Sequence, residues 1–270
     1  MLYSPSMTKP VRVVMSPPDF FDIEYSINPW MNTANKVHPE HAKREWDSLK
    51  STYQSLGLTI LTIPPVKGLP DLVFTTDHGV WIDDTFYLSR FRYPERQKEQ
   101  DVATPWYTSH KIKTQTIPSL CFMEGGDVLF HSGHIFLGYG FRTSENTAEY
   151  LHNASRHPVT ALELVDEAFY HLDTCFLPLS ADTAFYYPPA FTQEGVKALK
   201  KHFDILIPLT SHEAEGFACN SVIVGQTVIC QPNPTFEQKL IDLGYTPITL
   251  DMHEFNKSGG GIHCLSQIFR

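Results

Sequence analysis

Five copies of one pattern, at nearly constant spacing, constrain the fold of this chain more than any other sequence feature. Each copy reads as a strand, a tight turn and a second strand, and the copies begin at Asp71, Asp127, Asp173, Ala218 and, in truncated form, His263. Successive starts are 56, 46, 45 and 45 residues apart. Turn-forming pairs stand where two-residue hairpins need them, at Asp83-Asp84, Ser132-Gly133, Ala181-Asp182 and Gly225-Gln226. The chain therefore repeats one unit about five times.

Between the hairpins lie segments with the apolar periodicity of amphipathic helices. The clearest covers residues 39–56, where Pro39 favours a helix start and Gly57 a helix end. In a later segment, Thr235 and Gln238 have the spacing of a capping box. Helices are predicted at 39–56, 192–203, 235–243 and, from weaker patterns, at 95–113 and 144–157; short strands are predicted at 58–64, 204–209 and 246–250.

The repeating unit is thus a helix, a strand and a hairpin. A unit of this size cannot bury its own apolar face, so the copies must pack around a common centre. We therefore predict an α/β fold in which five units form a closed ring, with residues 1–270 as a single domain. A doubly wound sheet is the alternative, but it does not predict a hairpin after every helix–strand pair. No linker-like stretch indicates a domain boundary.

The composition restricts the partners that the chain is expected to bind. Of 270 residues, 42% are hydrophobic and 19% are charged, which is typical of a folded globular protein. The formal net charge is −9, so neither a nucleic acid nor an anionic membrane is an expected partner. A small cationic substrate is compatible with this charge. The sequence does not decide the oligomeric state, and a homo-oligomer stays open.

Features linked to location favour a cytoplasmic protein. No apolar run approaches the ~20 residues that a membrane-spanning helix needs. Residues 1–14 lack the apolar region of a secretory signal. The five cysteines are odd in number and include no C-x-x-C pair, so neither a disulfide framework nor a zinc ribbon is expected. Reduced thiols are the expectation.

Polar residues gather at equivalent positions of the repeats, at or just before the first strand of each hairpin. In a ring of units, these positions face the central axis. They include Asp71, Asp77, Glu124, His171, Asp173 and Cys264. A thiolate is a nucleophile, a histidine moves protons, and carboxylates bind a planar cation through charge-assisted hydrogen bonds. Such a set indicates a thiol enzyme that acts on a cation.

The cysteine and the histidine also have ordinary structural interpretations. A cysteine as near the C-terminus as Cys264 is usually only a buried thiol. The preceding run Gly259-Gly260-Gly261 favours catalysis, because glycines let backbone and substrate approach closely. A lone strand histidine is usually structural, but strand alternation would place His171 and Asp173 on one face, within reach of one ligand.

Other polar residues near the axis are expected to be structural. Asp127 lies three residues after Glu124, hence on the opposite face of a strand, and is expected to fix a loop. His131 and His134 flank a hairpin turn and are expected to be solvated rather than metal ligands. We predict no metal and no organic cofactor.

The segments PDLVFTTD, MEGGDVLF, GYGFRTS, HLDTCF and GGGIHCLS resemble signature segments of the guanidino-group modifying enzymes. That superfamily contains arginine deiminases, dimethylarginine dimethylaminohydrolases, arginine dihydrolases and amidinotransferases. The resemblance extends from about Val13 to the C-terminus and is specific for the superfamily, not for one member. It implies a five-bladed α/β propeller (the pentein fold) with pseudo-fivefold symmetry, in agreement with the repeats.

The resemblance also implies roles for the residues at the axis. Cys264 takes the place of the nucleophile and His171 that of the general acid and base. Asp77, Glu124 and Asp173 match the acidic residues that hold the guanidinium, with Glu124 grouped among the catalytic residues.

Further residues are expected to bind the substrate. Asp71 matches the other aspartate of the PD segment. Arg142 matches an arginine that binds the substrate carboxylate in related hydrolases, and Arg90 and Arg96 are further candidates. Asn28 lies in a segment expected at the edge of the site.

The expected function is hydrolysis of a guanidinium C–N bond through a covalent thiouronium on cysteine, in the manner of an arginine deiminase. Unmethylated arginine is expected to be preferred, because an additional carboxylate requires an N–H donor that a dimethylated nitrogen lacks. The alternatives are a dimethylarginine dimethylaminohydrolase, an arginine dihydrolase, an amidinotransferase and a propeller that only binds.

Overall fold

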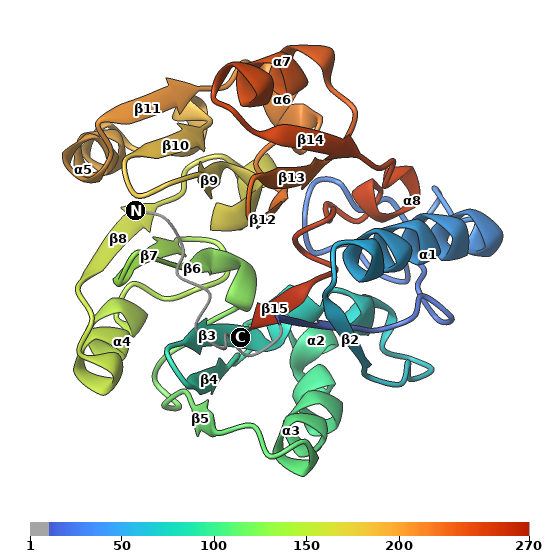
Figure 1. Cartoon of the computed structure of the whole chain (residues 1–270). Coiled ribbons are helices and arrows are strands. Elements are labelled where there is room, and N and C mark those ends of the chain that lie inside the picture. The colour runs from blue at the N-terminus through green and yellow to red at the C-terminus, as the bar shows by residue number, and fades with distance from the viewer. Residues whose placement is uncertain (1–10, 270) are drawn as a thin grey trace.

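The described chain forms five three-stranded sheets arranged in a ring, and in four of them a predicted hairpin supplies the inner and the central strand (Figure 1). The computed structural model describes residues 11–269; the remaining residues of the predicted 1–270 domain lie outside the described part. In each sheet, the central strand pairs antiparallel with the inner strand and parallel with the outer one. No doubly wound sheet occurs among the described residues.

Four sheets are each built from a hairpin and the strand that follows the next helix, whereas the predicted unit placed the helix and strand before the hairpin. They are β3 (Gly79–Ile82), β4 (Thr85–Leu88) and β5 (Thr114–Thr116); β6 (Val128–His131), β7 (His134–Tyr139) and β8 (Val159–Glu163); β9 (Phe176–Pro178), β10 (Thr183–Tyr186) and β11 (Ile205–Pro208); and β12 (Val222–Val224), β13 (Thr227–Cys230) and β14 (Thr246–Thr249). Three hairpin turns lie at the predicted pairs, where Asp83, Ser132 and Gly225 adopt the positive φ angles that such turns need. The two-residue turn predicted at Ala181-Asp182 is wrong, because residues 179–182 join β9 to β10 in a longer loop.

The fifth sheet joins the two ends of the described chain. It consists of β15 (Gln267–Phe269), β1 (Arg12–Met15) and β2 (Thr59–Thr62). In this sheet Val13 is paired with Ile268 across an antiparallel ladder and with Ile60 across a parallel one. The truncated fifth repeat is therefore completed by a strand from the N-terminal part of the chain, which the repeat analysis did not identify.

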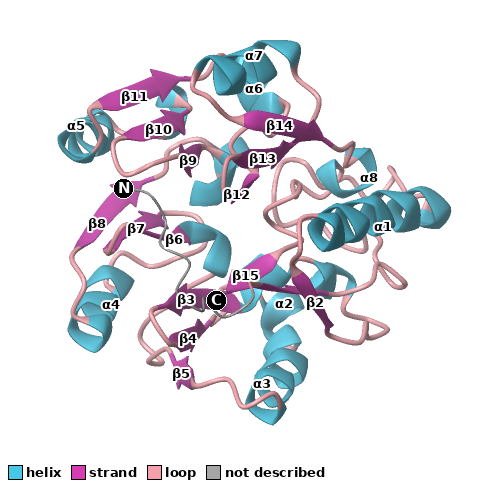
Figure 2. Ribbon diagram, viewed as in Figure 1, coloured by secondary structure: helices cyan, strands magenta, loops and turns pink. Residues whose placement is uncertain are grey.

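The longer helices lie outside the ring of strands (Figure 2). The described residues form eight α-helices. They are α1 (Pro39–Ser55), α2 (Pro94–Gln97), α3 (Glu99–Ser109), α4 (Thr147–Ser155), α5 (Gln193–His202), α6 (Ser211–Glu215), α7 (Pro234–Asp242) and α8 (His253–Asn256). The predicted helix at 39–56 is confirmed, and it buries Ala42, Trp46, Leu49 and Tyr53. No helix among residues 11–269 is long and apolar enough to cross a membrane.

One capping prediction is wrong. Helix α7 begins at Pro234, and its N-cap is Asn233, whose side chain accepts a hydrogen bond from the Phe236 amide. Pro at the first helical position favours this earlier start, so Thr235 lies inside the helix. A capping box does occur at α6, between Thr210 and Glu213.

A second correction concerns the segments that approach the axis. Before the inner strands, the chain forms 3₁₀ turns at Pro70–Val73, Thr75–His78, Gly125–Asp127 and Leu172–Thr174. These segments were expected to be strands, and the alternation argument that placed His171 and Asp173 on one face does not apply to a turn. The turns let consecutive side chains point in different directions at the centre of the ring.

Candidate active site

Cys264 lies in the loop between α8 and β15, and its side chain is buried at the centre of the ring. The Asn220 side-chain amide donates a hydrogen bond to its Sγ at 3.1 Å, and Oδ1 of the same residue accepts one from the Cys264 amide at 3.3 Å. Asp173 Oδ2 lies 3.6 Å from Sγ. Asn220 thus fixes the cysteine on two sides. It occupies the repeat position that other blades fill with acids, which was the only sequence signal for it.

The glycines before Cys264 are required by close packing. A Cβ on Gly260 would collide with the Phe74 ring, and one on Gly261 would lie 2.9 Å from Asn220 Oδ1. Gly259 has a φ of +80°, in the region that favours glycine. The predicted close approach at the glycine run is therefore present, and it positions both Asn220 and the cysteine loop.

His171 is fully buried between two carboxylates. Its Nε2 lies 3.0 Å from Glu124 Oε2, and its Nδ1 lies 3.5 Å from Asp77 Oδ1. Gly126 makes this approach possible, since a Cβ there would lie 2.7 Å from Nδ1. Burial lowers the pKa of His171, but Asp77, Asp127 and Glu124 outweigh it and raise the pKa to about 9. The imidazole is therefore protonated at neutral pH.

Asp77 and Asp71 lie on either side of the buried Arg96 guanidinium. Arg96 donates to Asp77 Oδ2 at 2.6 Å and forms a two-pronged ion pair with Glu99 at 2.8 and 2.9 Å. Asp71 Oδ2 accepts a hydrogen bond from the Tyr25 hydroxyl at 2.8 Å, while its buried Oδ1 has no partner among the described residues. Burial opposes ionisation of Asp77, but His171 and Arg96 hold its pKa below the usual range.

Arg142 is buried and pairs with the same glutamate that holds the histidine. Its Nη1 donates to Glu124 Oε2 at 2.9 Å, and its guanidinium lies between the rings of Tyr93 and Tyr170, about 4.6 and 4.5 Å from their centres. Burial raises the pKa of Glu124, but Arg142 and His171 lower it well below its usual range. Glu124 is thus a carboxylate that connects the arginine to the histidine.

Two predicted binding residues have less direct placements. Asn28 lies at the edge of the site, where its side chain donates to the Ser258 carbonyl and accepts from the Trp30 and Met31 amides. Arg90 is not brought to the site. Its guanidinium donates to the Cys121 carbonyl and lines a separate cavity. The chain turns between Arg90 and Arg96, so the two arginines point into different parts of the protein.

Asp127 has the structural position expected for it. Its two carboxylate oxygens accept hydrogen bonds from the backbone amides of Leu172 and Thr143 at 3.1 and 3.2 Å. Burial raises its pKa to about 7. Asp127 therefore holds the turn that carries Asp173 next to the segment that carries Arg142.

The surroundings of the Cys264 thiol oppose its ionisation. Burial, together with the nearby carboxylates of Asp173 and Asp77, raises its pKa well above the usual value. The cavity beside it is lined by Asp71, Asp77, Arg96, Arg142 and Cys264, among others, and measures about 10 Å³. This is roughly the space of one water molecule.

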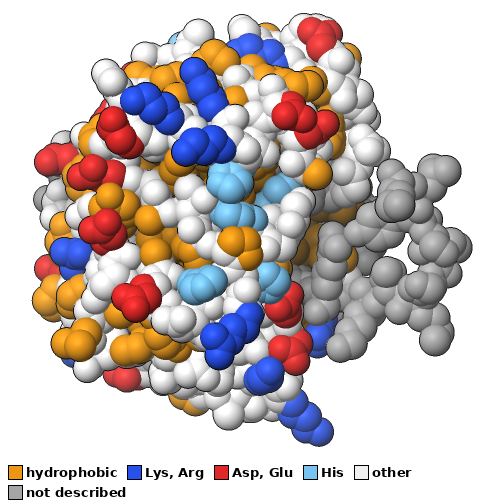
Figure 3. Space-filling model, turned by 90° about the vertical axis from the view of Figure 1, so that its left-hand side faces the viewer, with side chains coloured by type: hydrophobic (Ala, Val, Ile, Leu, Met, Phe, Trp, Pro, Cys, Tyr) orange, Lys and Arg blue, Asp and Glu red, His pale blue; other side chains and the backbone are white. Residues whose placement is uncertain are grey.

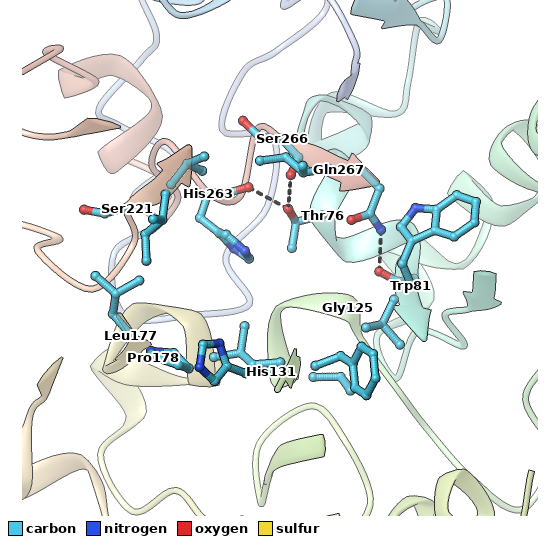
Figure 4. Close-up of a pocket in the computed structure, with 18 residues that line it drawn as sticks. Thr76, Trp81, Gly125, His131, Leu177, Pro178, Ser221, His263, Ser266 and Gln267 are labelled. Atoms are coloured by element: carbon cyan, nitrogen blue, oxygen red, sulfur yellow. Dashed lines mark hydrogen bonds between the residues drawn. The ribbon is translucent and has the colours of Figure 1, made fainter. Parts of the chain in front are cut away.

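A second cavity, of about 250 Å³, lies on the axis between the inner strands of all five sheets (Figure 4). Its lining includes His263, the residue before the cysteine, together with Thr76, His131 and Gln267. Cys264 lines the first cavity and His263 the second. Residues 11–269 contain no group of three or more histidine, cysteine or acidic side chains placed to hold a metal ion.

Comparison with known proteins identifies the family. A family model described as "N,N dimethylarginine dimethylhydrolase, eukaryotic" matches residues 21–270. The chain belongs to this family. The N(G),N(G)-dimethylarginine dimethylaminohydrolase of Mycobacterium tuberculosis is 36% identical over 255 residues, which cover 94% of this chain and 84% of that protein. The bifunctional arginine dihydrolase/ornithine cyclodeaminase ArgZ of Synechocystis is 35% identical and covers 96% of this chain, which spans only 38% of ArgZ.

Solved structures confirm the predicted fold and superfamily. The N-terminal domain of ArgZ, in a cysteine-to-serine variant bound to its substrate, has a TM-score of 0.91 at 34% identity and covers 96% of this chain and 97% of that one. The same domain in an asparagine-to-serine variant, covalently bonded to a reaction intermediate, has a TM-score of 0.92 with the same coverage. This dimethylargininase-family chain is therefore a five-bladed α/β propeller of the guanidino-group modifying superfamily.

Proposed function

We propose that this protein is a cysteine-dependent hydrolase that cleaves a C–N bond in the guanidinium group of an N-methylated arginine, giving citrulline and a methylated amine. The observation that carries the proposal is a buried thiol, Cys264, surrounded by carboxylates suited to a cation, in a chain of the dimethylarginine hydrolase family. The site residues named below are part of this proposal.

Substrate binding would activate the nucleophile. The carboxylates near Cys264 oppose its ionisation in the unliganded protein, so a bound guanidinium reverses the local charge and favours the thiolate. Asp173 lies 3.6 Å from Sγ, and Asp71 has an unpartnered oxygen, so both are suited to hold guanidinium N–H groups.

His171 would move the protons of both half-reactions. The thiolate attacks the guanidinium carbon and forms a C–S bond. Protonated His171 then donates its proton to the departing amine as the C–N bond breaks, which leaves a thiouronium on Cys264. Neutral His171 next takes a proton from water as the water oxygen bonds to the same carbon. As that adduct collapses, the C–S bond breaks and the hydroxyl group loses its proton to solvent, which releases the thiolate and neutral citrulline.

The choice of a methylated substrate departs from the preference expected from the sequence. That preference rested on one additional carboxylate, Asp173, which would need an N–H group from the substrate; asymmetric dimethylarginine still offers the N–H groups of its unmethylated nitrogens. Asp77 and Glu124 are compensated by Arg96 and Arg142 of the protein itself, at 2.6 and 2.9 Å. A dimethylated nitrogen would leave neither of them unpaired. The family model and the mycobacterial relative also support methylated arginine.

A second candidate is hydrolysis of arginine in the manner of an arginine dihydrolase. It is supported by ArgZ, whose N-terminal domain matches this chain over nearly its full length and has been described with a bound substrate and a covalent intermediate. Under this alternative, arginine would give ornithine and two molecules of ammonia, rather than citrulline and one.

Product analysis with equal concentrations of asymmetric dimethylarginine and arginine tests the proposal, with Cys264→Ser as the blank. We expect dimethylamine and citrulline with the higher kcat/KM. Ornithine and two ammonia from arginine would establish the dihydrolase. Activity only when an amine acceptor is added would establish an amidinotransferase, and binding without turnover of any guanidine would overturn the enzymatic proposal.

A further inference from the structure

His263 separates the two axial cavities, and its role is not explained by the chemistry above. Its backbone continues directly into Cys264, but its imidazole lines the larger cavity, where it is labelled in Figure 4. A quarter of the side chain is exposed. Its Nδ1 lies 2.8 Å from Asp173 Oδ2, the same oxygen that lies 3.6 Å from Cys264 Sγ. One carboxylate oxygen is thus shared between the histidine and the thiol.

The backbone of His263 is firmly held. Its amide donates to Asn220 Oδ1 at 3.1 Å, and its carbonyl accepts from the Thr76 hydroxyl at 2.6 Å. The imidazole is therefore presented to Asp173 from a fixed main chain. An ionised carboxylate only accepts hydrogen bonds, so Nδ1 is the donor of this contact, and Nε2 is left on the side of the larger cavity.

Asp173 has little else to orient it. Its Oδ1 is buried and has no hydrogen-bond partner among residues 11–269. No lysine or arginine in that part of the chain lies within ion-pair distance of this carboxylate, unlike Asp77 and Glu124. A buried carboxylate is costly unless it is hydrogen-bonded, and besides the thiol the His263 imidazole is the side chain that bonds to this one. The His263 contact therefore determines which oxygen faces the thiol and leaves Oδ1 available to a ligand.

We propose that His263 is a positioning residue for the guanidino reaction. Its imidazole lies on the side of the axial cavity, away from Cys264, and its Nδ1–H orients Asp173 toward the thiol and the substrate cation. This inference rests on the proposed function. It assigns the role to one atom, Nδ1, and substitutions can test this. The side-chain amide nitrogen of asparagine reproduces the position of Nδ1, whereas that of glutamine reproduces the position of Nε2.

The test compares His263→Leu, His263→Gln and His263→Asn. Without the hydrogen bond to a charged group, we expect kcat/KM for the guanidino substrate to fall at least about 10-fold in His263→Leu and His263→Gln. His263→Asn, whose amide nitrogen replaces Nδ1, should recover most of the loss. His131→Asn changes the other imidazole of the same cavity and should leave the activity unchanged.

Binding measured without turnover separates positioning from a general structural effect. In a Cys264→Ser background, His263→Leu should weaken substrate binding by a similar factor, as measured by calorimetry, and His263→Asn should restore it. Equal activity and binding in His263→Leu and the parent would overturn the inference, and so would rescue by Gln rather than Asn. If Cys264→Ser itself binds no guanidino compound, the proposed function fails instead.

Discussion

Among individual residues, the carboxylates around His171 determine whether it can act as an acid. Glu124→Gln removes one negative charge 3.0 Å from the imidazole, so the pKa of His171, now about 9, should fall. We expect the alkaline limb of kcat/KM to move toward neutral pH by on the order of 1 pH unit. A pH profile of kcat/KM measures this. Glu95→Gln, at an exposed position of α2, is the control. An unmoved alkaline limb would contradict the assignment of His171 as the acid.

Removing the nucleophile gives a second prediction at this scale. Cys264→Ala should lower turnover by about 10⁴-fold or more, since it removes the thiol proposed to form the covalent intermediate. The loop is held by Asn220 and the glycines, so the melting temperature should stay close to that of the parent. A haloacetamidine should label Cys264 in the parent and leave this variant unlabelled. Cys121→Ala, at a buried thiol away from the site, should keep activity and labelling.

The sequence indicated the acids, the histidine and the cysteine because they recur at equivalent repeat positions. It could not separate Arg90 from Arg96, since both follow the same motif and differ only in how the chain turns after β4. For Asn220 it offered only the equivalent repeat position, because the contacts that this residue makes with Cys264 depend on the folded loop around the cysteine. The sequence also could not show that Arg96 and Arg142 compensate the charges of Asp77 and Glu124, because these ion pairs depend on side-chain geometry.

Among the helices and strands, the start of α7 shows how caps decide boundaries. Asn233→Ala removes the side chain that accepts a hydrogen bond from the Phe236 amide. We expect this substitution to lower the free energy of unfolding by about 1 kcal/mol. Thr235→Ala, the cap suggested by sequence spacing alone, should change stability by much less. Urea unfolding of both variants distinguishes the two positions. A larger loss in Thr235→Ala would restore the earlier assignment.

The histidines that gather on one outer face predict a sensitivity to acid (Figure 3). His134 and His202 both contact the Thr160 hydroxyl, at 2.8 and 2.9 Å, and their rings lie 4.3 Å apart. Burial and the neighbouring His202 lower the pKa of His134 to about 4. As the pH falls, His134 is therefore protonated in the unfolded chain before it is protonated in the folded protein. Its contribution to stability is complete above about pH 6.5 and declines toward pH 4.

His134→Gln should remove part of that decline. The melting temperature of this variant should fall less than that of the parent between about pH 6.5 and 4, while both behave alike near neutral pH. His212→Gln, at an exposed position of α6, is the matched control. Parallel curves for the parent and His134→Gln would show that this histidine pair does not contribute to the acid response.

For the whole molecule, the repeat spacing predicted the number of blades and their hairpins, because each unit must bury its apolar face against the next. It did not predict how the ring closes. The strand at Arg12–Met15 belongs to no repeat, and its parallel partner β2 and antiparallel partner β15 lie 44 and more than 250 residues away. This pairing forms only in the complete ring, so local sequence patterns do not predict it.

Ring closure therefore couples global stability to the site, and Val14→Asp tests this coupling. Val14 is fully buried on β1, and β15, with which β1 pairs, begins three residues after Cys264. An unpaired carboxylate at this position should destabilise the protein by several kcal/mol and free the cysteine loop. We expect a lower urea midpoint, and we expect catalytic activity to disappear in the same transition. Thr59→Asp, at an exposed position of β2 in the same sheet, should change neither. If Val14→Asp unfolded the fifth sheet while activity persisted, the site would be independent of ring closure.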